Sequence, residues 1–204
     1  MLFSDSYITI TEKASLLYKS KGSKFYAFAF PVEKESEIKV IIADLKMQYP
    51  DATHHCYAYV LGMDKSAFRA NDDGEPSGTA GKPILRQIQK MELTNTLVVV
   101  VRYFGGTLLG VNGLIEAYGE SAAEVLKLCP LKTHEITEKY LLSCNFGEEK
   151  DIYRVCKQFQ LQTIIQHDPS CFSAEIKIPL RIVAPFKAAI KDLYHLRIQY
   201  TGIE

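Results

Sequence analysis

Hydrophobic and polar residues follow patterns that divide residues 24–126 into strands and helices. The segment 24–31 alternates small and aromatic side chains, as expected of a strand that is covered on both faces. Apolar residues at helical spacing predict a helix over 38–49, which the following Pro50 ends. The same criteria predict strands at 55–61 and 96–103 and helices at 82–92 and 114–126. The polar segment 71–83 and the glycine-rich segment 105–113 are predicted to be loops.

A compact second unit is predicted from residue 134 onward. Its pattern indicates strand, helix, two strands, helix and strand, over 139–144, 152–159, 162–166, 171–178, 186–193 and 197–201. This order is typical of a ferredoxin-like domain, and Asp168 to Ser170 supply a hairpin turn. The sequence therefore predicts an N-terminal α/β domain of residues 1–133 and a small α+β domain of residues 134–204.

Charge and composition limit the classes of partner. The 204 residues hold 24 basic and 24 acidic side chains, so no field of the whole molecule attracts nucleic acid or an anionic membrane. No apolar run is long enough for a membrane span and the start of the chain lacks a leader pattern, so we expect a cytoplasmic protein without a membrane partner. The five cysteines include no CxxC pair, which favours buried thiols over a disulfide framework or a structural zinc site.

An acidic loop is the first candidate for chemistry. Asp72, Asp73 and Glu75 offer oxygen ligands, but they lack the alternating spacing of a calcium loop, so we expect neither a metal nor a cofactor. Their role stays open, because Asp side chains also cap backbone amides in tight turns. Further along the loop, Thr79, Gly81 and Lys82 precede a predicted helix, where free amides, a hydroxyl and a cation would hold an anion.

A second loop joins a predicted central strand to a helix. It contains Arg102, Tyr103, Gly105, Gly106 and Gly110. Amides at a helix N-terminus together with an arginine suit a phosphate or carboxylate. The loop matches neither dinucleotide nor P-loop spacing, and its glycines would also allow tight packing of helix on sheet. The sequence leaves anion contact and packing as equal alternatives.

Two histidines begin a predicted strand. Side-chain alternation places His54 on the same face as Cys56 and His55 on the opposite face, which disfavours joint chelation of a metal. One imidazole would serve as an acid or base near the acidic loop, although a structural hydrogen bond is the simpler and favoured explanation of each histidine. No nucleophile motif is present.

Basic residues gather in one short segment. Lys19, Lys21 and Lys24 stand beside Phe25 and Tyr26, and cations interleaved with aromatic rings suit phosphate contact and base stacking. A solvated turn that leads into a strand accounts for the same pattern. Whether other cations join this patch depends on the fold.

Four motifs together carry a resemblance to a known family. They are KSKGSKF at 19–25, DATHHCYAYV at 51–60, DDGEPSGTAGKPIL at 72–85 and VVVVRYFGGTLLGVNGLIEAYGESA at 98–122. In this order and spacing, the chain closely resembles the IMPACT/YigZ family in its two-domain bacterial form. The family's signature surface then falls on Lys24, His54, His55, Asp72, Asp73, Glu75, Thr79, Gly81, Arg102, Tyr103, Gly105, Gly106 and Gly110.

The resemblance implies an α+β protein. Its N-terminal domain would share the fold of the second domain of a small-subunit ribosomal protein and of domain IV of elongation factor G. Its C-terminal domain would be ferredoxin-like, similar to domains III and V of that factor. Eukaryotic relatives bind a ribosome-associated activator of the amino-acid-starvation kinase. We expect no RWD domain of the kind that precedes the shared domain in those relatives, so that partnership is not carried over.

Three functional hypotheses follow. The leading one is a non-enzymatic, translation-linked regulator that binds RNA or the ribosome through the N-terminal loops, although this rests on analogy of fold. The second is an enzyme acting on a phosphorylated or carboxylated small molecule, which requires an acid of the acidic loop to line one pocket with a histidine and Arg102. The third is a protein-binding adaptor, which requires an exposed apolar patch.

Overall fold

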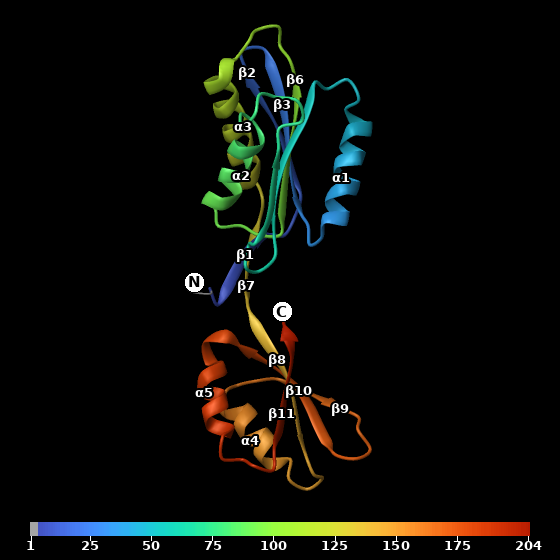
Figure 1. The fold of residues 1–204 in the computed structure, drawn as a ribbon, viewed down its shortest axis with the longest axis vertical. Coiled ribbons are helices and arrows are strands. Elements are labelled where there is room, and N and C mark those ends of the chain that lie inside the picture. Colours follow the sequence, from blue (N-terminus) through green and yellow to red (C-terminus); the bar gives the residue numbers. More distant parts are fainter. Residues whose placement is uncertain (1–3) are drawn as a thin grey trace. The chain divides into compact units, whose positions relative to one another are not determined.

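The structure, a computed structural model, describes residues 4–204 and divides them into two compact units (Figure 1). The first unit is Tyr7–His134, and the second comprises Glu135–Glu204 with the described residues up to Ser6. The sequence predicts that residues 1–133 form the N-terminal domain, whereas in the structure the described residues 4–6 group with the second unit. Among the described helices, none is long and apolar enough to cross a membrane.

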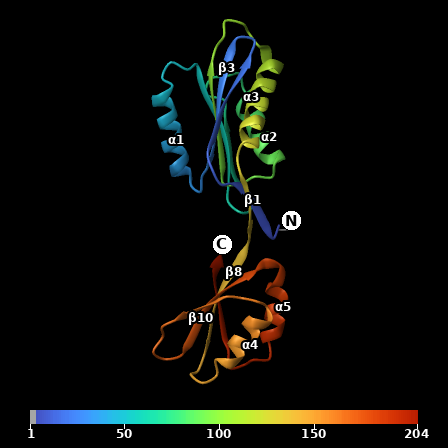
Figure 2. The ribbon, with the colours of Figure 1, turned by 180° about the vertical axis from the view of Figure 1, so that it is seen from behind.

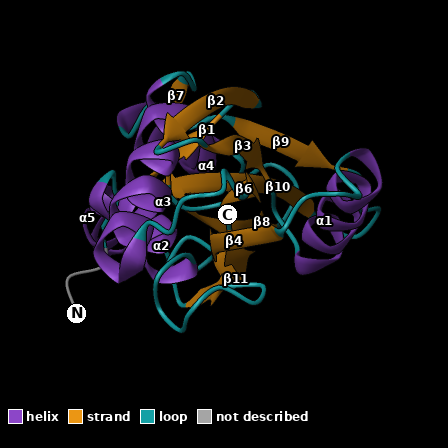
Figure 3. Ribbon diagram, turned by 90° about the horizontal axis from the view of Figure 1, so that it is seen from above, coloured by secondary structure: helices purple, strands orange, loops and turns teal. Residues whose placement is uncertain are grey.

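The first unit is built on a five-stranded antiparallel sheet with helices on both faces. The strands, in spatial order, are β2 (Ala14–Ser20), β3 (Ser23–Pro31), β6 (Thr96–Tyr103), β4 (His54–Leu61) and β5 (Ala67–Asn71). Helix α1 (Glu35–Gln48) covers one face, and helices α2 (Gly81–Lys90) and α3 (Gly110–Lys127) cover the other (Figures 1, 2 and 3). Outside this sheet, β1 (Ser6–Ile10) pairs with β7 (Leu131–Glu135).

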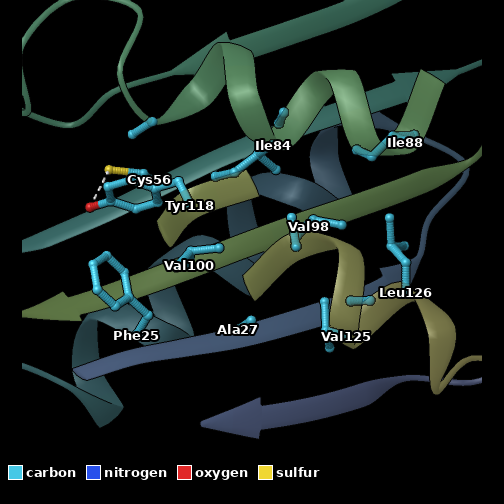
Figure 4. Close-up of a cluster of buried hydrophobic side chains, with 14 of the residues drawn as sticks. Phe25, Ala27, Cys56, Ile84, Ile88, Val98, Val100, Tyr118, Val125 and Leu126 are labelled. Atoms are coloured by element: carbon cyan, nitrogen blue, oxygen red, sulfur yellow. Dashed lines mark hydrogen bonds between the residues drawn. The ribbon is translucent and has the colours of Figure 1, made fainter. Parts of the chain in front are cut away.

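The central strand β6 is buried on both faces. Val98 and Val100 face α2 and α3 in the larger core (Figure 4). Val99 and Val101 face α1 in the smaller core. Each buried valine contributes about 1.5–3 kcal/mol to folding. This explains why a run of β-branched residues, rather than an alternating pattern, marks the middle of the sheet.

Several element boundaries differ from those predicted. Helix α3 begins at Gly110, inside the segment predicted to be a loop, because packing of Leu109 and Leu114 overrides the weak helical propensity of its glycines. Strands β1, β2, β5 and β7 have no counterpart among the predicted elements. Strand β2 is an edge strand whose residues are only partly buried, so its hydrophobic pattern is weak.

The second unit has the element order that the sequence predicts. It comprises β8 (Thr137–Cys144), α4 (Lys150–Gln158), β9 (Thr163–Gln166), β10 (Phe172–Pro179), α5 (Leu180–Ile190) and β11 (Arg197–Ile203). The strands form an antiparallel sheet in the order β11-β8-β10-β9. Helix α5 begins six residues before its predicted start and contains Pro185. Because proline is unfavourable inside a helix, the sequence pattern favours a start after this residue.

The cysteines are free thiols. Cys56, Cys129, Cys144 and Cys156 are buried, as predicted, and Cys171 is partly exposed. Cys144 and Cys156 pack in the hydrophobic core of the second unit. The four buried thiols therefore contribute to packing.

Candidate functional site

Three loops meet at one end of the first unit and form what we call the loop platform. They are the β2–β3 turn (21–22), the acidic loop (72–80) and the glycine loop (104–109). A Cβ added to Gly105 would lie 1.9 Å from the carbonyl carbon of Gly22, so the two backbones touch. The Gly105 amide also donates to Ser23 Oγ at 3.2 Å. For Gly105 the sequence allows either anion contact or tight packing. The contact with Gly22 is close enough that packing alone requires a glycine here.

Asp72 organises the acidic loop from within. Its carboxylate accepts hydrogen bonds from the amides of Gly78 at 2.8 Å, Ala80 at 3.0 Å and Gly81 at 2.8 Å. Burial raises the pKa of the Asp72 carboxyl, but these amides and the charge of nearby Lys82 outweigh burial, so the pKa is lower than usual. Asp72 is therefore ionised and holds the start of α2.

The anion site predicted at the start of α2 is consequently occupied by the protein itself. The Gly81 amide donates to the Asp72 carboxylate, and the buried Thr79 hydroxyl donates to the Pro76 carbonyl at 2.6 Å. Neither group is free for an external phosphate, contrary to the expectation for Thr79 and Gly81. Lys82 is exposed on α2.

Glu75 lies at the centre of a buried polar network. Its Oε1 accepts from Arg102 Nη1 at 2.6 Å and from the Tyr118 hydroxyl at 2.7 Å. The Cys56 thiol lies 3.3 Å from the Tyr118 oxygen (Figure 4). Burial raises the pKa of both Tyr118 and Cys56, which keeps these two groups neutral. The only charges in this network are thus those of Glu75 and Arg102, which compensate each other.

Arg102 is held on all sides. Its guanidinium lies over the rings of Phe25 and Phe104, 5.5 Å and 5.8 Å from the ring centroids, and Nη2 is 3.4 Å from Ser23 Oγ. Only Nε lacks a hydrogen-bond partner among the described residues. Arg102 therefore joins the acidic loop to the sheet and is not an exposed cation.

The two histidines point to opposite faces, as the alternation predicts. His54 Nδ1 lies 2.8 Å from the Asp73 carbonyl oxygen, which can only accept, so Nδ1 carries a proton. His54 Nε2 is 3.8 Å from Glu75 Oε1. His55 is buried against α1, and burial lowers the pKa of its imidazole. Its backbone amide donates to Asp73 Oδ2 at 2.7 Å, so Asp73 also serves a structural hydrogen bond.

A cleft of about 530 Å³ opens beside this network. Glu75, His54 and Arg102 line it, together with Phe104, Leu108 and Val111 of the glycine loop and α3. The three apolar side chains are 48%, 85% and 57% exposed, respectively. The enzyme hypothesis requires an acid that lines one pocket with a histidine and Arg102, and Glu75 meets this requirement whereas Asp72 and Asp73 do not. The adaptor hypothesis requires an exposed apolar patch, and the apolar side chains at the rim of the cleft provide one. The described residues include no cluster of side chains suited to hold a metal ion.

Three exposed lysines lie on the β2–β3 hairpin. Lys19 and Lys24 are directly opposite each other across the two strands, and Lys21 occupies the turn with a φ of 44°. No ion pair joins any of the three to a described acid. Lys24 also lines a hollow of about 310 Å³ with Gly22, Tyr26, Tyr103 and Phe104. The hairpin is therefore a positive surface of the platform whose three lysines have no ion-pair partner among the described acids.

Two further glycines, one in the glycine loop and one at the first position of α3, have backbone conformations that favour glycine. Gly106 and Gly110 have φ of 83° and 72°, and no atom of another part of the chain approaches their added Cβ positions. These residues shape the loop rather than pack against a neighbour. Sequence reasoning missed Ser23 and Tyr118, because an isolated hydroxyl gives no signal of its distant partner.

Comparison with known proteins places this geometry in a family. The model of the Impact N-terminal domain matches residues 21–126. An IMPACT family member of Haemophilus influenzae is 33% identical over 177 residues, which cover 85% of this chain and 84% of that protein. YigZ of Escherichia coli is 29% identical over 202 residues, 98% of this chain and 99% of its own.

Two further likenesses extend the comparison. The mouse protein IMPACT is 37% identical over 95 residues, which cover 44% of this chain and 29% of that protein. A crystal structure described as a hypothetical protein superposes with a TM-score of 0.67 at 28% identity and covers 98% of both chains. The match therefore extends over both units and includes the residues of the loop platform. The chain belongs to the IMPACT family.

Proposed function

We propose that this protein is a translation-linked regulator that binds RNA on the ribosome through the loop platform. Membership of the IMPACT family supports the link to translation, and the implied likeness to domains of a ribosomal protein and of elongation factor G is part of the same proposal. One observation carries it: the acids of the platform are used internally, whereas Lys19, Lys21 and Lys24 have no described ion-pair partner.

Local charge matters here more than net charge. Asp72 and Glu75 direct their carboxylates to amides, to Arg102 and to Tyr118, so they offer little repulsion to a phosphate at the hairpin. Like charges directly opposite each other on neighbouring strands are unfavourable, as for Lys19 and Lys24. A phosphate bound between these two lysines would offset that repulsion.

Direct binding to ribosomes and to ribosomal RNA fragments tests the proposal. Substitution of Lys21→Asn and Lys24→Gln removes two charges, and asparagine tolerates the positive φ of position 21. We expect this variant to lose affinity for every RNA tested, because phosphate contacts do not depend on sequence. The matched control is Lys90→Gln, which replaces an exposed lysine at the C-terminal end of α2, away from the acidic loop that precedes this helix. Absence of binding by the natural protein at low salt would contradict the proposal.

A second candidate function rests on the cleft. We propose for it a small molecule whose phosphate or carboxylate contacts His54, because His54 lines a cavity of a size usual for ligand sites together with the charge-compensated pair of Glu75 and Arg102. A panel of phosphorylated and carboxylated compounds should then include one that raises the melting temperature of the natural protein and not that of His54→Asn. If no compound raises it, the cleft is not a small-molecule site.

A further inference from the structure

The face of the sheet that carries α1 is covered only in part. A groove of about 380 Å³ separates α1 from β2 and β3, with Phe28 and Phe30 of β3 as its floor and Ile41 and Leu45 of α1 as its wall. Both phenylalanines remain partly accessible, although they pack against the smaller core. The first unit therefore has an apolar hollow that is separate from the cleft at Glu75.

Aromatic rings form a continuous row along this face. Phe30 stacks on Phe28 with centroids 6.4 Å apart, and Phe28 is 5.7 Å from Tyr49. Tyr49 is 5.5 Å from Tyr26, which is 5.9 Å from Tyr103. Residues 26, 28 and 30 share one face because side chains alternate along a strand, with about 6.6 Å between them. The row thus connects the groove to the hollow beside Lys24.

Cations lie at both ends of the row. Lys13 lines the groove beside Phe30, and Lys24 pairs across the sheet with Tyr103. Neither lysine has an ion-pair partner among the described acids. Asp44 also lines the groove, and Asp51 lies near Tyr103, so the surface carries acids as well. With Lys19 on the same hairpin, the cations beside the row outnumber these acids.

We infer that this aromatic row binds single-stranded RNA, with unpaired bases against the rings and phosphates at Lys13 and Lys24. The inference rests on the proposed function and specifies its ligand. Bases in a duplex are already stacked and hide their faces, so only an unpaired strand can use the row. Stacking on aromatic side chains tolerates any base, while lysines bind the backbone. An apolar peptide would fill the groove without a need for lysines at both ends.

Fluorescence anisotropy with the full chain tests the inference. The probe is an unstructured RNA of about 12 nucleotides, compared with the same sequence as a duplex. Phe28→Leu with Phe30→Leu removes both rings while keeping apolar side chains. We expect at least about tenfold weaker binding of the single strand. The control is Phe68→Leu, a phenylalanine of β5 that is exposed and lines neither the groove nor the hollow, and it should bind as the natural protein does.

Photo-crosslinking keeps the test valid if the double variant folds poorly. RNA containing 4-thiouridine, bound to the natural protein, should crosslink to peptides that contain residues 24–31 or Tyr49. Crosslinks elsewhere only, or unchanged affinity of the folded double variant, would overturn the inference. In that case, retained binding of ribosomes and sensitivity to Lys21→Asn with Lys24→Gln would leave the proposed function intact. Failure of the natural protein to bind any RNA would reject both.

Discussion

At the scale of single residues, the ion pair of Glu75 and Arg102 holds the platform together. Their side chains are only 3% and 7% exposed. Glu75→Gln keeps the shape of the side chain but leaves the arginine charge buried without compensation. We expect the free energy of unfolding to fall by about 3–5 kcal/mol, measured by urea denaturation at neutral pH.

The double variant Glu75→Gln with Arg102→Met provides the control for this prediction. It removes both charges, so it should lose less stability than the sum of the two single losses. Additive losses would mean that the two side chains act independently, contrary to the 2.6 Å contact between them.

The sequence identifies most of these residues but not their roles. The adjacent histidines could be assigned to opposite faces, because alternation along a strand is local. The role of Glu75 could not be assigned, because its partners Arg102 and Tyr118 are 27 and 43 residues away. Arg102 likewise gives a signal of anion binding in the sequence, whereas its anion is a side chain of the same protein.

At the scale of elements, strong patterns were predictable and weak ones were not. The buried run of β6 has its predicted bounds, because a β-branched strand with both faces covered has few alternatives. Edge strands such as β2 and β5 depend on neighbours for their place and carry little pattern of their own. The start of α2 was predictable, but the hydrogen-bond acceptor of its first amides was not. Asp72 accepts from them only because the acidic loop folds back on the helix.

Asp72 makes the attachment of α2 sensitive to acid. Its folded-state pKa is lowered, so its contribution to stability is complete above the unfolded value of about 3.9 and is lost as the pH falls through the folded value. Asp72→Asn places an amide NH2 against the Gly78 amide and leaves that donor unsatisfied, which should cost about 1–3 kcal/mol at pH 7. It should also reduce the loss of stability between pH 7 and acid pH, measured by denaturation at each pH.

Asp192→Asn is the control for the acid prediction. Asp192 is exposed and forms no hydrogen bond or ion pair among the described side chains. This substitution should leave the pH dependence of stability as in the natural protein. If Asp72→Asn retains the full acid sensitivity, other groups must be responsible for it.

At the scale of the whole molecule, zero net charge limits how RNA would be bound. With 24 basic and 24 acidic side chains, the protein has no long-range attraction to nucleic acid, so binding would depend on cations that are locally free. On the hairpin and the groove these cations are Lys13, Lys19, Lys21 and Lys24, which form no ion pair with a described acid, whereas Arg102 is paired with Glu75. Composition alone excluded a basic module, and only the fold separates the free cations from the paired ones.

This small set of cations sets the salt dependence. For single-stranded RNA, each neutralised phosphate contributes about −0.7 to the slope of log K against log salt concentration, so four lysines predict a slope of about −3. Anisotropy titrations at several salt concentrations measure it, and Lys24→Gln should make the slope shallower by about 0.7 while Lys90→Gln leaves it unchanged. A much steeper slope would require cations from outside the hairpin and the groove. A slope near zero, with binding retained, would instead assign the affinity to stacking on the aromatic row alone, because stacking releases no counterions.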